Sequence, residues 1–339
     1  GKDLRVAVPA IVECKDKIDQ TPNVYLAGME HLDERYIKAI QYATKAPRAE
    51  HPKMVLLIDL VSDQEDQLVT ASTDVIQMAQ QRGAEGFIAI SPEARKRFWS
   101  DRARTAAIAA HTNAFKINED VVIPLPRLTE YSEGVERINI EQSLLNKLAM
   151  VEAVTAFLQT QTSKDYLHGE ENAKIFADKK SAALDLLQRI QNQWCQINDS
   201  LDEPAINYSH LLNATALAAL NTQDRLIDLI QRRDFRISYR ENIAKPLNEI
   251  FCGEQWEKLR KQLDSIHKQV LSSRLIVALH MHAGDGNVHT NIPVNSNDYA
   301  MLQAADAIVD RIMALATKLG GVISGEHGIG ITKMHYLSK

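Results

Sequence analysis

The segment with the greatest chemical potential is HAGDGNVH, which begins at His282 and ends at His289. Asp285 stands between Gly284 and Gly286, a composition typical of a turn that reverses a strand. Such a reversal would hold two imidazoles close together on adjacent strands, where they could bind a divalent metal. Histidines at this spacing are also common as packed or exposed residues, so the spacing by itself leaves both readings open.

A third ligand in such a metal site is usually a histidine or a carboxylate, and the candidate is Glu326 in the segment GEHGIG. A catalytic site of this kind keeps one coordination position open for a substrate oxygen. His280 precedes His282 by two residues and therefore shares its strand face, where we expect it to be packed rather than a ligand. We expect His335 at the surface.

Strands and helices must bring these motifs together, and residues 20–130 carry patterns of both. In chain order we expect a strand at Lys53–Val61, a helix that begins with a capping box at Ser62 and Glu65, a strand at Glu85–Ile90, a helix that begins at Ser91-Pro92, and a strand at Asp120–Pro124. The alternation predicts a sheet covered by helices.

Residues 131–270 are expected to be almost wholly helical, because Ile140–Leu158 and Ile175–Ile197 carry apolar residues at helical spacing. Such helices usually pack into a bundle, and the alternative is a docking arm for a partner. The rest of the chain returns to strands. We expect strands at Arg274–His282 and from the turn at 283–286 to Pro293, then a helix at Asp298–Leu319 and a short strand at Val322–Ser324.

Composition limits the class of protein. The 339 residues are 45% hydrophobic and 24% charged, which is typical of a soluble globular protein. The net charge of −5 argues against a general nucleic-acid binder. Cys14, Cys195 and Cys252 lie far apart and form neither a disulfide framework nor a CxxC site, which favours a cytoplasmic setting. No apolar run approaches the roughly 18–20 residues that span a bilayer.

Two segments in this order, HAGDGNVHTN (His282–Asn291) and GEHGIG (Gly325–Gly330), resemble the C-terminal part of FAD-linked oxidases. That family includes D-lactate dehydrogenases, glycolate oxidases and D-2-hydroxyglutarate dehydrogenase. The resemblance implies an α+β fold with a ferredoxin-like antiparallel sheet, helices on one face, and a large all-α insertion of the kind found in large bacterial FAD/FMN-binding members. Residues 1–144 and 271–339 would form the substrate (cap) domain, and residues 145–270 the insertion.

The resemblance also implies roles for the residues of the two motifs. His282, His289 and Glu326 match the ligands of a divalent metal, with zinc expected before manganese or iron. His327 matches the general base, and Asn291 matches a residue near the substrate.

Two cations upstream match family residues that hold the substrate carboxylate. Arg102 ends the segment Trp99-Ser-Asp-Arg102, which is similar to a Trp-x-x-Arg motif of the family, and Lys116 precedes the next strand. Arginine suits a carboxylate because its fork can bond both oxygens. A solvated basic face is the alternative for Arg102, because other basic residues share its expected helix.

The implied function is the substrate domain of an FAD-dependent dehydrogenase that oxidises a D-2-hydroxy acid to the 2-oxo acid. A metal would assist alkoxide formation, His327 would take the proton, and the flavin would accept a hydride. Nothing in residues 1–50 resembles the family's flavin-binding loop, so we expect FAD to be bound mainly by a domain absent from this chain, and the chain alone to be inactive.

The expected partners are a small 2-hydroxy acid anion, the flavin domain and an iron–sulfur segment of the full-length protein, and not a nucleic acid. Peripheral association with the inner membrane stays open. Two other functions compete with this one. The first is a metal-dependent hydrolase that uses His280, His282 and His289, and the second is a non-catalytic docking module.

Overall fold

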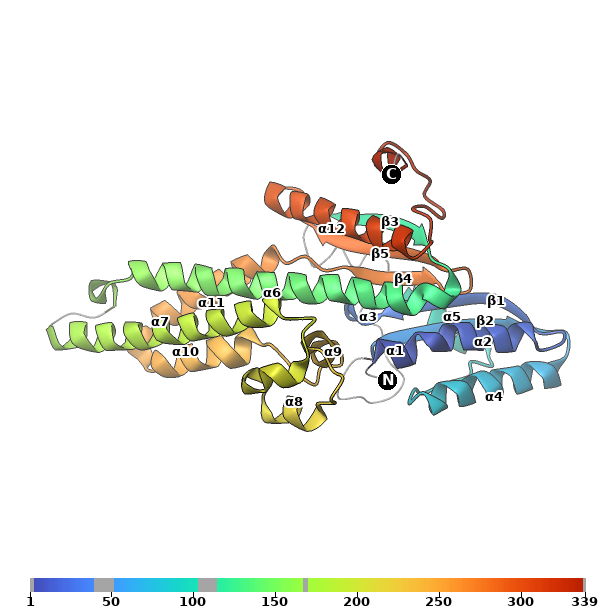
Figure 1. The fold of residues 1–339 in the computed structure, drawn as a ribbon, viewed down its shortest axis with the longest axis horizontal. Helices are drawn as coiled ribbons and strands as arrows, with labels where there is room; N and C mark the ends of the chain where they lie inside the picture. Colours follow the sequence, from blue (N-terminus) through green and yellow to red (C-terminus); the bar gives the residue numbers. More distant parts are fainter. Residues whose placement is uncertain (1–2, 40–51, 103–114, 167–169, 338–339) are drawn as a thin grey trace. The chain divides into compact units, whose positions relative to one another are not determined.

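The computed structural model describes residues 3–39, 52–102, 115–166 and 170–337 (Figure 1). The chain divides into two compact units, which we call the sheet unit (residues 1–138 and 275–339) and the helical unit (residues 139–274). The expected boundaries, at 144/145 and 270/271, lie a few residues inside the helical unit. The assignment of the sheet unit as a substrate (cap) domain stays a prediction.

The sheet unit contains a five-stranded sheet with the strand order β2-β1-β4-β5-β3. All its neighbouring strands pair antiparallel, so the predicted α+β class with an antiparallel sheet is confirmed. The ferredoxin-like subtype stays a prediction. The strands are β1 (Tyr25–Asp33), β2 (Met54–Val61), β3 (Phe115–Val122), β4 (Ala278–His282) and β5 (Asn287–Val294).

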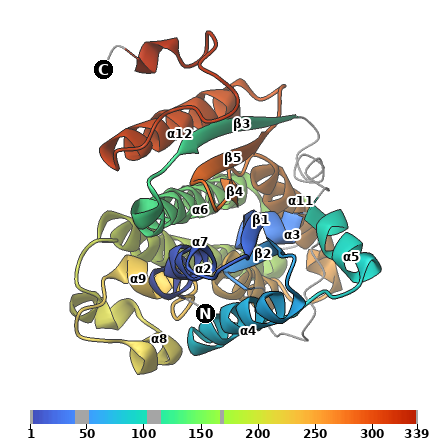
Figure 2. The ribbon, with the colours of Figure 1, turned by 90° about the vertical axis from the view of Figure 1, so that its right-hand side faces the viewer.

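The helices of the sheet unit are α1 (Leu4–Ala7), α2 (Pro9–Asp19), α3 (Glu34–Ala39), α4 (Glu65–Gln81), α5 (Pro92–Arg102) and α12 (Tyr299–Lys318). Figures 1 and 2 show α12 lying along β3 and β5. The helix α6 (Leu128–Thr160) begins in the sheet unit and ends in the helical unit.

The two faces of the sheet differ in chemistry, because successive side chains of a strand point to opposite faces. One face is apolar: Met281 of β4 and Val288 of β5 belong to a core that also contains Ile308 and Ile312 of α12. The other face is polar. Its register places His280 opposite His289, and His289 opposite Asp120 of β3. The candidate site therefore lies on the face that the apolar core leaves free.

The helical unit has its own core, which includes Phe176, Trp194 and Trp256. Its other helices are α7 (Glu170–Asp199), α8 (Ala214–Ala219), α9 (Leu226–Gln231), α10 (Lys245–Ile250) and α11 (Glu257–Ser272). Short 3-10 turns lie at Leu125–Arg127, Ser163–Asp165, Ala205–Leu211, Glu254–Trp256 and Met334–Tyr336 across the two units, and a π turn lies at Arg240–Ala244. The predicted helices Ile140–Leu158 and Ile175–Ile197 are confirmed within α6 and α7.

Several predicted elements of the sheet unit were confirmed. The strand at Lys53–Val61 is β2, and α5 begins at Pro92 with the Ser91 hydroxyl accepting a hydrogen bond from the Ala94 amide at 3.1 Å. The helix expected at Asp298–Leu319 is α12, with Asp298 as its N-cap.

Other predictions were wrong. Residues 85–90 form no strand, and Phe87, Ile88 and Ile90 are exposed, because no described strand pairs with this segment. The helix α4 begins at Glu65 and has no capping box at Ser62, whose hydroxyl instead accepts from the Gln64 amide at 3.0 Å. The strand expected at 322–324 is reduced to one bridge, between Val122 and Val322.

Over the described ranges, no helix combines the length and the apolar character needed to cross a membrane.

Candidate active site

Three potential metal ligands converge at one end of the polar sheet face. His282 ends β4, His289 lies on β5, and Glu326 lies in the loop after α12. The distance from His282 Nε2 to Glu326 Oε1 is 3.3 Å, and that from His289 Nε2 to Glu326 Oε2 is 3.6 Å. One ligand atom from each residue lies within 4.8 Å of the other two. The structure therefore brings together the three residues that the sequence motifs single out.

The turn between β4 and β5 makes this convergence possible. Gly286 adopts a φ of +73°, in the left-handed region, and a Cβ atom there would lie 2.2 Å from the Ile123 carbonyl oxygen. Only glycine avoids both the backbone strain and the contact. The reversal then sets His282 next to the strand that carries His289.

Glu30 of β1 orients the first of these histidines. Its side chain is buried, and its Oε1 atom lies 2.6 Å from His282 Nδ1. The carboxylate accepts the Nδ1 proton, which leaves Nε2 unprotonated and facing Glu326. A carboxylate on the second ring nitrogen is the usual support of a histidine that binds a metal.

His289 is buried, and neither of its ring nitrogens makes a hydrogen bond within the described residues. Burial lowers its pKa; the Glu326 carboxylate acts in the opposite direction, and His282 and His327 add to the lowering. His289 is therefore neutral near pH 7, which is the protonation state that binds a metal. A buried ring nitrogen without a hydrogen bond fits the place of a metal ligand.

His280 is packed, as expected, and is not part of the convergent set. Its ring stacks on His289 with centroids 4.5 Å apart and planes 8° from parallel. The Asn291 amide nitrogen lies 3.2 Å from His280 Nδ1, and the Asn291 side chain is fully buried. Asn291 therefore contacts the histidine stack from within the sheet.

The loop that carries Glu326 and His327 is fixed to β3 through Asp120, which is fully buried. Asp120 Oδ2 accepts hydrogen bonds from the backbone amides of Gly325 at 2.7 Å, of Glu326, and of His327 at 3.0 Å. Burial would raise the pKa of the Asp120 carboxyl, but Lys333 and these amides hold it below its usual range. Asp120 is therefore a carboxylate that anchors the loop.

His327, the expected base, lies beside the three potential ligands. Its ring centroid is 5.2 Å from that of His289, and its Nδ1 is 3.6 Å from Asp120 Oδ1. Its side chain is 36% exposed, so it can reach a molecule from solution.

The two predicted substrate cations are not gathered at this point. Lys116 shares the polar face with Asp120 but lies four residues along β3, which corresponds to roughly 13 Å. Burial lowers the pKa of Lys116. Arg102 is the last residue of α5, and its side chain lies outside the described residues.

The sequence motifs did not identify Glu30 or Asp120. Both lie on strands far away in sequence from the residues that they contact, so only the strand register reveals them. Asp120 fell inside a predicted strand, but nothing in its local pattern marked it as an anchor.

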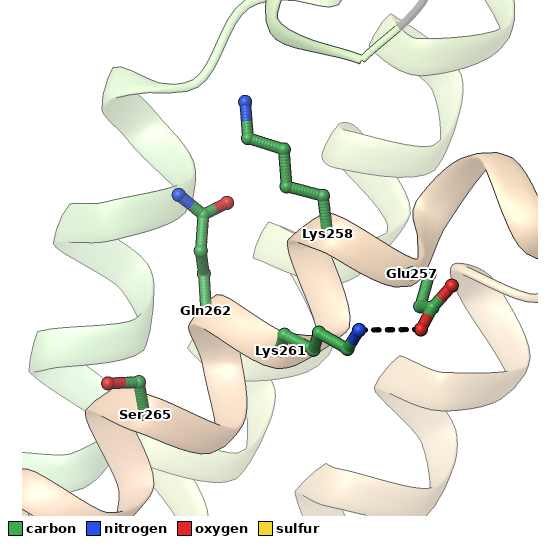
Figure 3. Close-up of a pocket in the computed structure, with 5 residues that line it drawn as sticks. All are labelled: Glu257, Lys258, Lys261, Gln262 and Ser265. Atoms are coloured by element: carbon green, nitrogen blue, oxygen red, sulfur yellow. Dashed lines mark ion pairs between the residues drawn. The ribbon is translucent and has the colours of Figure 1, made fainter.

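A shallow depression in the helical unit offers no comparable chemistry. Its lining residues all come from α11: Glu257, Lys258, Lys261, Gln262 and Ser265 (Figure 3). Lys261 is paired with Glu257 at 2.7 Å, and Gln262 accepts a hydrogen bond from the Tyr166 hydroxyl at 2.9 Å. These contacts are those of an ordinary solvated helix surface.

Known proteins resemble parts of this chain. A D-lactate dehydrogenase of Anaerostipes hadrus is 46% identical over 59 residues, which are 17% of this chain and 12% of that protein. A mitochondrial D-2-hydroxyglutarate dehydrogenase of Danio rerio is 28% identical over 125 residues, or 37% of this chain and 21% of the relative. Glycolate oxidase subunit GlcD of Escherichia coli K12 is 41% identical over 63 residues, or 19% and 13%. The matched segments thus span only a minor part of these relatives.

A family comparison covers far more of the chain. Residues 3–157 and 213–339 match the family described as FAD linked oxidases, C-terminal domain. The match includes all the strands of the sheet and both histidine motifs. The chain therefore belongs to the C-terminal domain family of the FAD linked oxidases.

Proposed function

We propose that this chain is the substrate domain of an FAD-dependent dehydrogenase that oxidises a D-2-hydroxy acid to the 2-oxo acid. The observation that carries the proposal is the convergence of His282, His289 and Glu326 beside His327 in a member of this family. The similar proteins named above are a D-lactate dehydrogenase, a D-2-hydroxyglutarate dehydrogenase and a component of glycolate oxidase, which supports a 2-hydroxy acid as substrate.

The convergent residues fit a divalent metal. His289 has a buried nitrogen without a hydrogen bond, and His282 has its second nitrogen held by Glu30. Two imidazoles and a carboxylate suit zinc, and also manganese or iron. When bound, the metal would polarise the substrate hydroxyl and lower the pKa of that group.

His327 is the proposed general base. Its partly exposed ring lies next to the potential ligands, and the nearby Asp120 carboxylate favours an imidazole that has accepted a proton. His327 would take the hydroxyl proton while the hydrogen on the same carbon leaves as a hydride, for which the flavin, when bound, supplies the acceptor.

Lys116 and Arg102 are proposed to bind the anionic groups of the substrate. The lowered pKa of Lys116 indicates partial desolvation, which would strengthen its attraction to a carboxylate. Asn291 is fully buried against His280, so we propose that it supports the stacked histidines. Its direct contact with substrate stays a prediction.

The flavin is proposed to come mainly from another domain of a longer protein, together with an iron–sulfur segment as a further partner. The matched segments cover between 12% and 21% of the relatives named above, so their whole activities cannot reside in this part alone. A cytoplasmic location, with or without peripheral attachment to the inner membrane, completes the proposal. No observation favours the hydrolase, because His280 is packed against Asn291.

Metal analysis tests the proposal directly. The wild-type chain is expected to retain about one zinc ion per chain after dialysis, whereas His282→Ala and His289→Ala each lose most of it, because two ligands seldom hold zinc in a protein. His335→Ala is the matched control, since His335 is exposed and outside the convergent set. Equal zinc content in all four proteins would contradict the metal site.

A further inference from the structure

Lys333 is buried in the loop that follows the GEHGIG motif, with its side chain only 3% exposed. Its ammonium lies 2.9 Å from Asp120 Oδ1, 3.0 Å from the Asp120 carbonyl oxygen and 2.9 Å from the Ile323 carbonyl oxygen. Glu119 Oε2 is a further neighbour at 3.1 Å. A buried ammonium is stable only when oxygens replace its hydration, and here every proton has an acceptor.

The Lys333 contacts continue directly into the candidate metal site. Asp120 binds the ammonium through Oδ1 and accepts the backbone amides of Gly325, Glu326 and His327 through Oδ2. One carboxylate thus joins the buried ammonium to three successive residues of the loop, and the middle one of these carries the potential ligand.

The same loop approaches the sheet as closely as a chain can. A Cβ atom on Gly325 would lie 2.5 Å from the Asn287 side-chain oxygen. Upstream, the backbones of Val122 and Val322 exchange two hydrogen bonds, each 2.9 Å long. The loop is therefore fastened to β3 on both sides of Glu326, by the backbone before it and by Lys333 after it.

We propose that Lys333 is a positioning residue of the metal site: its ammonium fixes the Asp120 carboxylate, which holds the Gly325–His327 backbone so that Glu326 faces His282 and His289. This inference rests on the metal site of the proposed function. Lys333 touches neither the metal nor the substrate, and its effect passes through Asp120 and the loop. Supporting residues of this kind typically change metal affinity by about 10- to 100-fold.

The test measures zinc affinity of the 339-residue chain by competition with a chromophoric chelator. Lys333→Met keeps the volume but removes the charge, and it is expected to weaken zinc binding by about 10- to 100-fold. Lys333→Arg keeps the charge and is expected to recover most of the affinity. Lys318→Met, at the exposed end of α12, is the matched control and should bind zinc like the wild type.

A second measurement separates this inference from the proposed function. Amide hydrogen exchange of Gly325, Glu326 and His327, followed without metal, is expected to be slow in the wild type and in Lys333→Arg and faster in Lys333→Met. If the wild type binds no zinc, the metal site of the proposed function fails, and the exchange result alone decides whether Lys333 fixes the loop. Unchanged exchange in Lys333→Met, or unchanged zinc affinity where the wild type binds zinc, would overturn the inference.

Discussion

Glu30 offers the sharpest test of how the site is oriented, because it supports a potential ligand without being one. Its carboxylate is buried and 2.6 Å from His282 Nδ1. Glu30→Gln keeps the shape but replaces a charge-assisted hydrogen bond by a neutral one. A hydrogen bond to a charged group contributes about 1.5–3 kcal/mol, and a neutral one about 1 kcal/mol. The difference, roughly 1–2 kcal/mol, corresponds to a 5- to 30-fold loss of zinc affinity.

The assay is again chelator competition, with Glu30→Ala expected to lose more than Glu30→Gln, up to about 100-fold. Glu65→Gln, on the exposed first turn of α4, is the control and should leave the zinc affinity unchanged. Thermal unfolding without metal identifies any variant that fails to fold. The reasoning is refuted if folded Glu30→Gln and Glu30→Ala both bind zinc as tightly as the wild type.

Three further predictions concern other residues. In the full-length flavoenzyme, His327→Ala should lower kcat by about 10²- to 10⁴-fold with its metal content unchanged; turnover at the wild-type rate would exclude it as the base. Burial lowers the pKa of His31 from 6.5 to about 4, so the unfolded chain binds its proton first and stability falls as the pH drops from 6.5 towards 4, by about 3 kcal/mol. Urea unfolding at several pH values should show this loss reduced in His31→Leu, and equal losses in both proteins would contradict it. Burial raises the pKa of Cys14 to about 11, so iodoacetamide at pH 8 should label exposed Cys252 well before Cys14, as mass spectrometry of the peptides can show; labelling of Cys14 first would contradict the burial.

The sequence predicted local features of the site well. The glycines around Asp285 determine the turn, and the turn alone brings His282 and His289 onto neighbouring strands. Glu326 was predicted from its chemistry, and the structure places it within reach of both histidines. These features depend on short stretches of chain, where residue type and backbone conformation are closely linked.

The features that were missed depend on contacts between distant segments. Glu30 and His282 are 252 residues apart, and Asp120 is 207 residues from His327. No local pattern specifies which strands become neighbours or in which register. The same reason explains the wrong strand at 85–90, because a short apolar run forms a strand only where another strand is available to pair with it.

The central claim is that His282, His289 and Glu326 share one metal ion, and X-ray absorption spectroscopy of the zinc-loaded chain tests it most directly. The account predicts about two imidazole nitrogens near 2.0 Å and oxygen ligands for the remainder, with imidazole scattering reduced in His289→Ala. Zinc surrounded only by oxygen, or a spectrum that is the same in the wild type and His289→Ala, would contradict the claim.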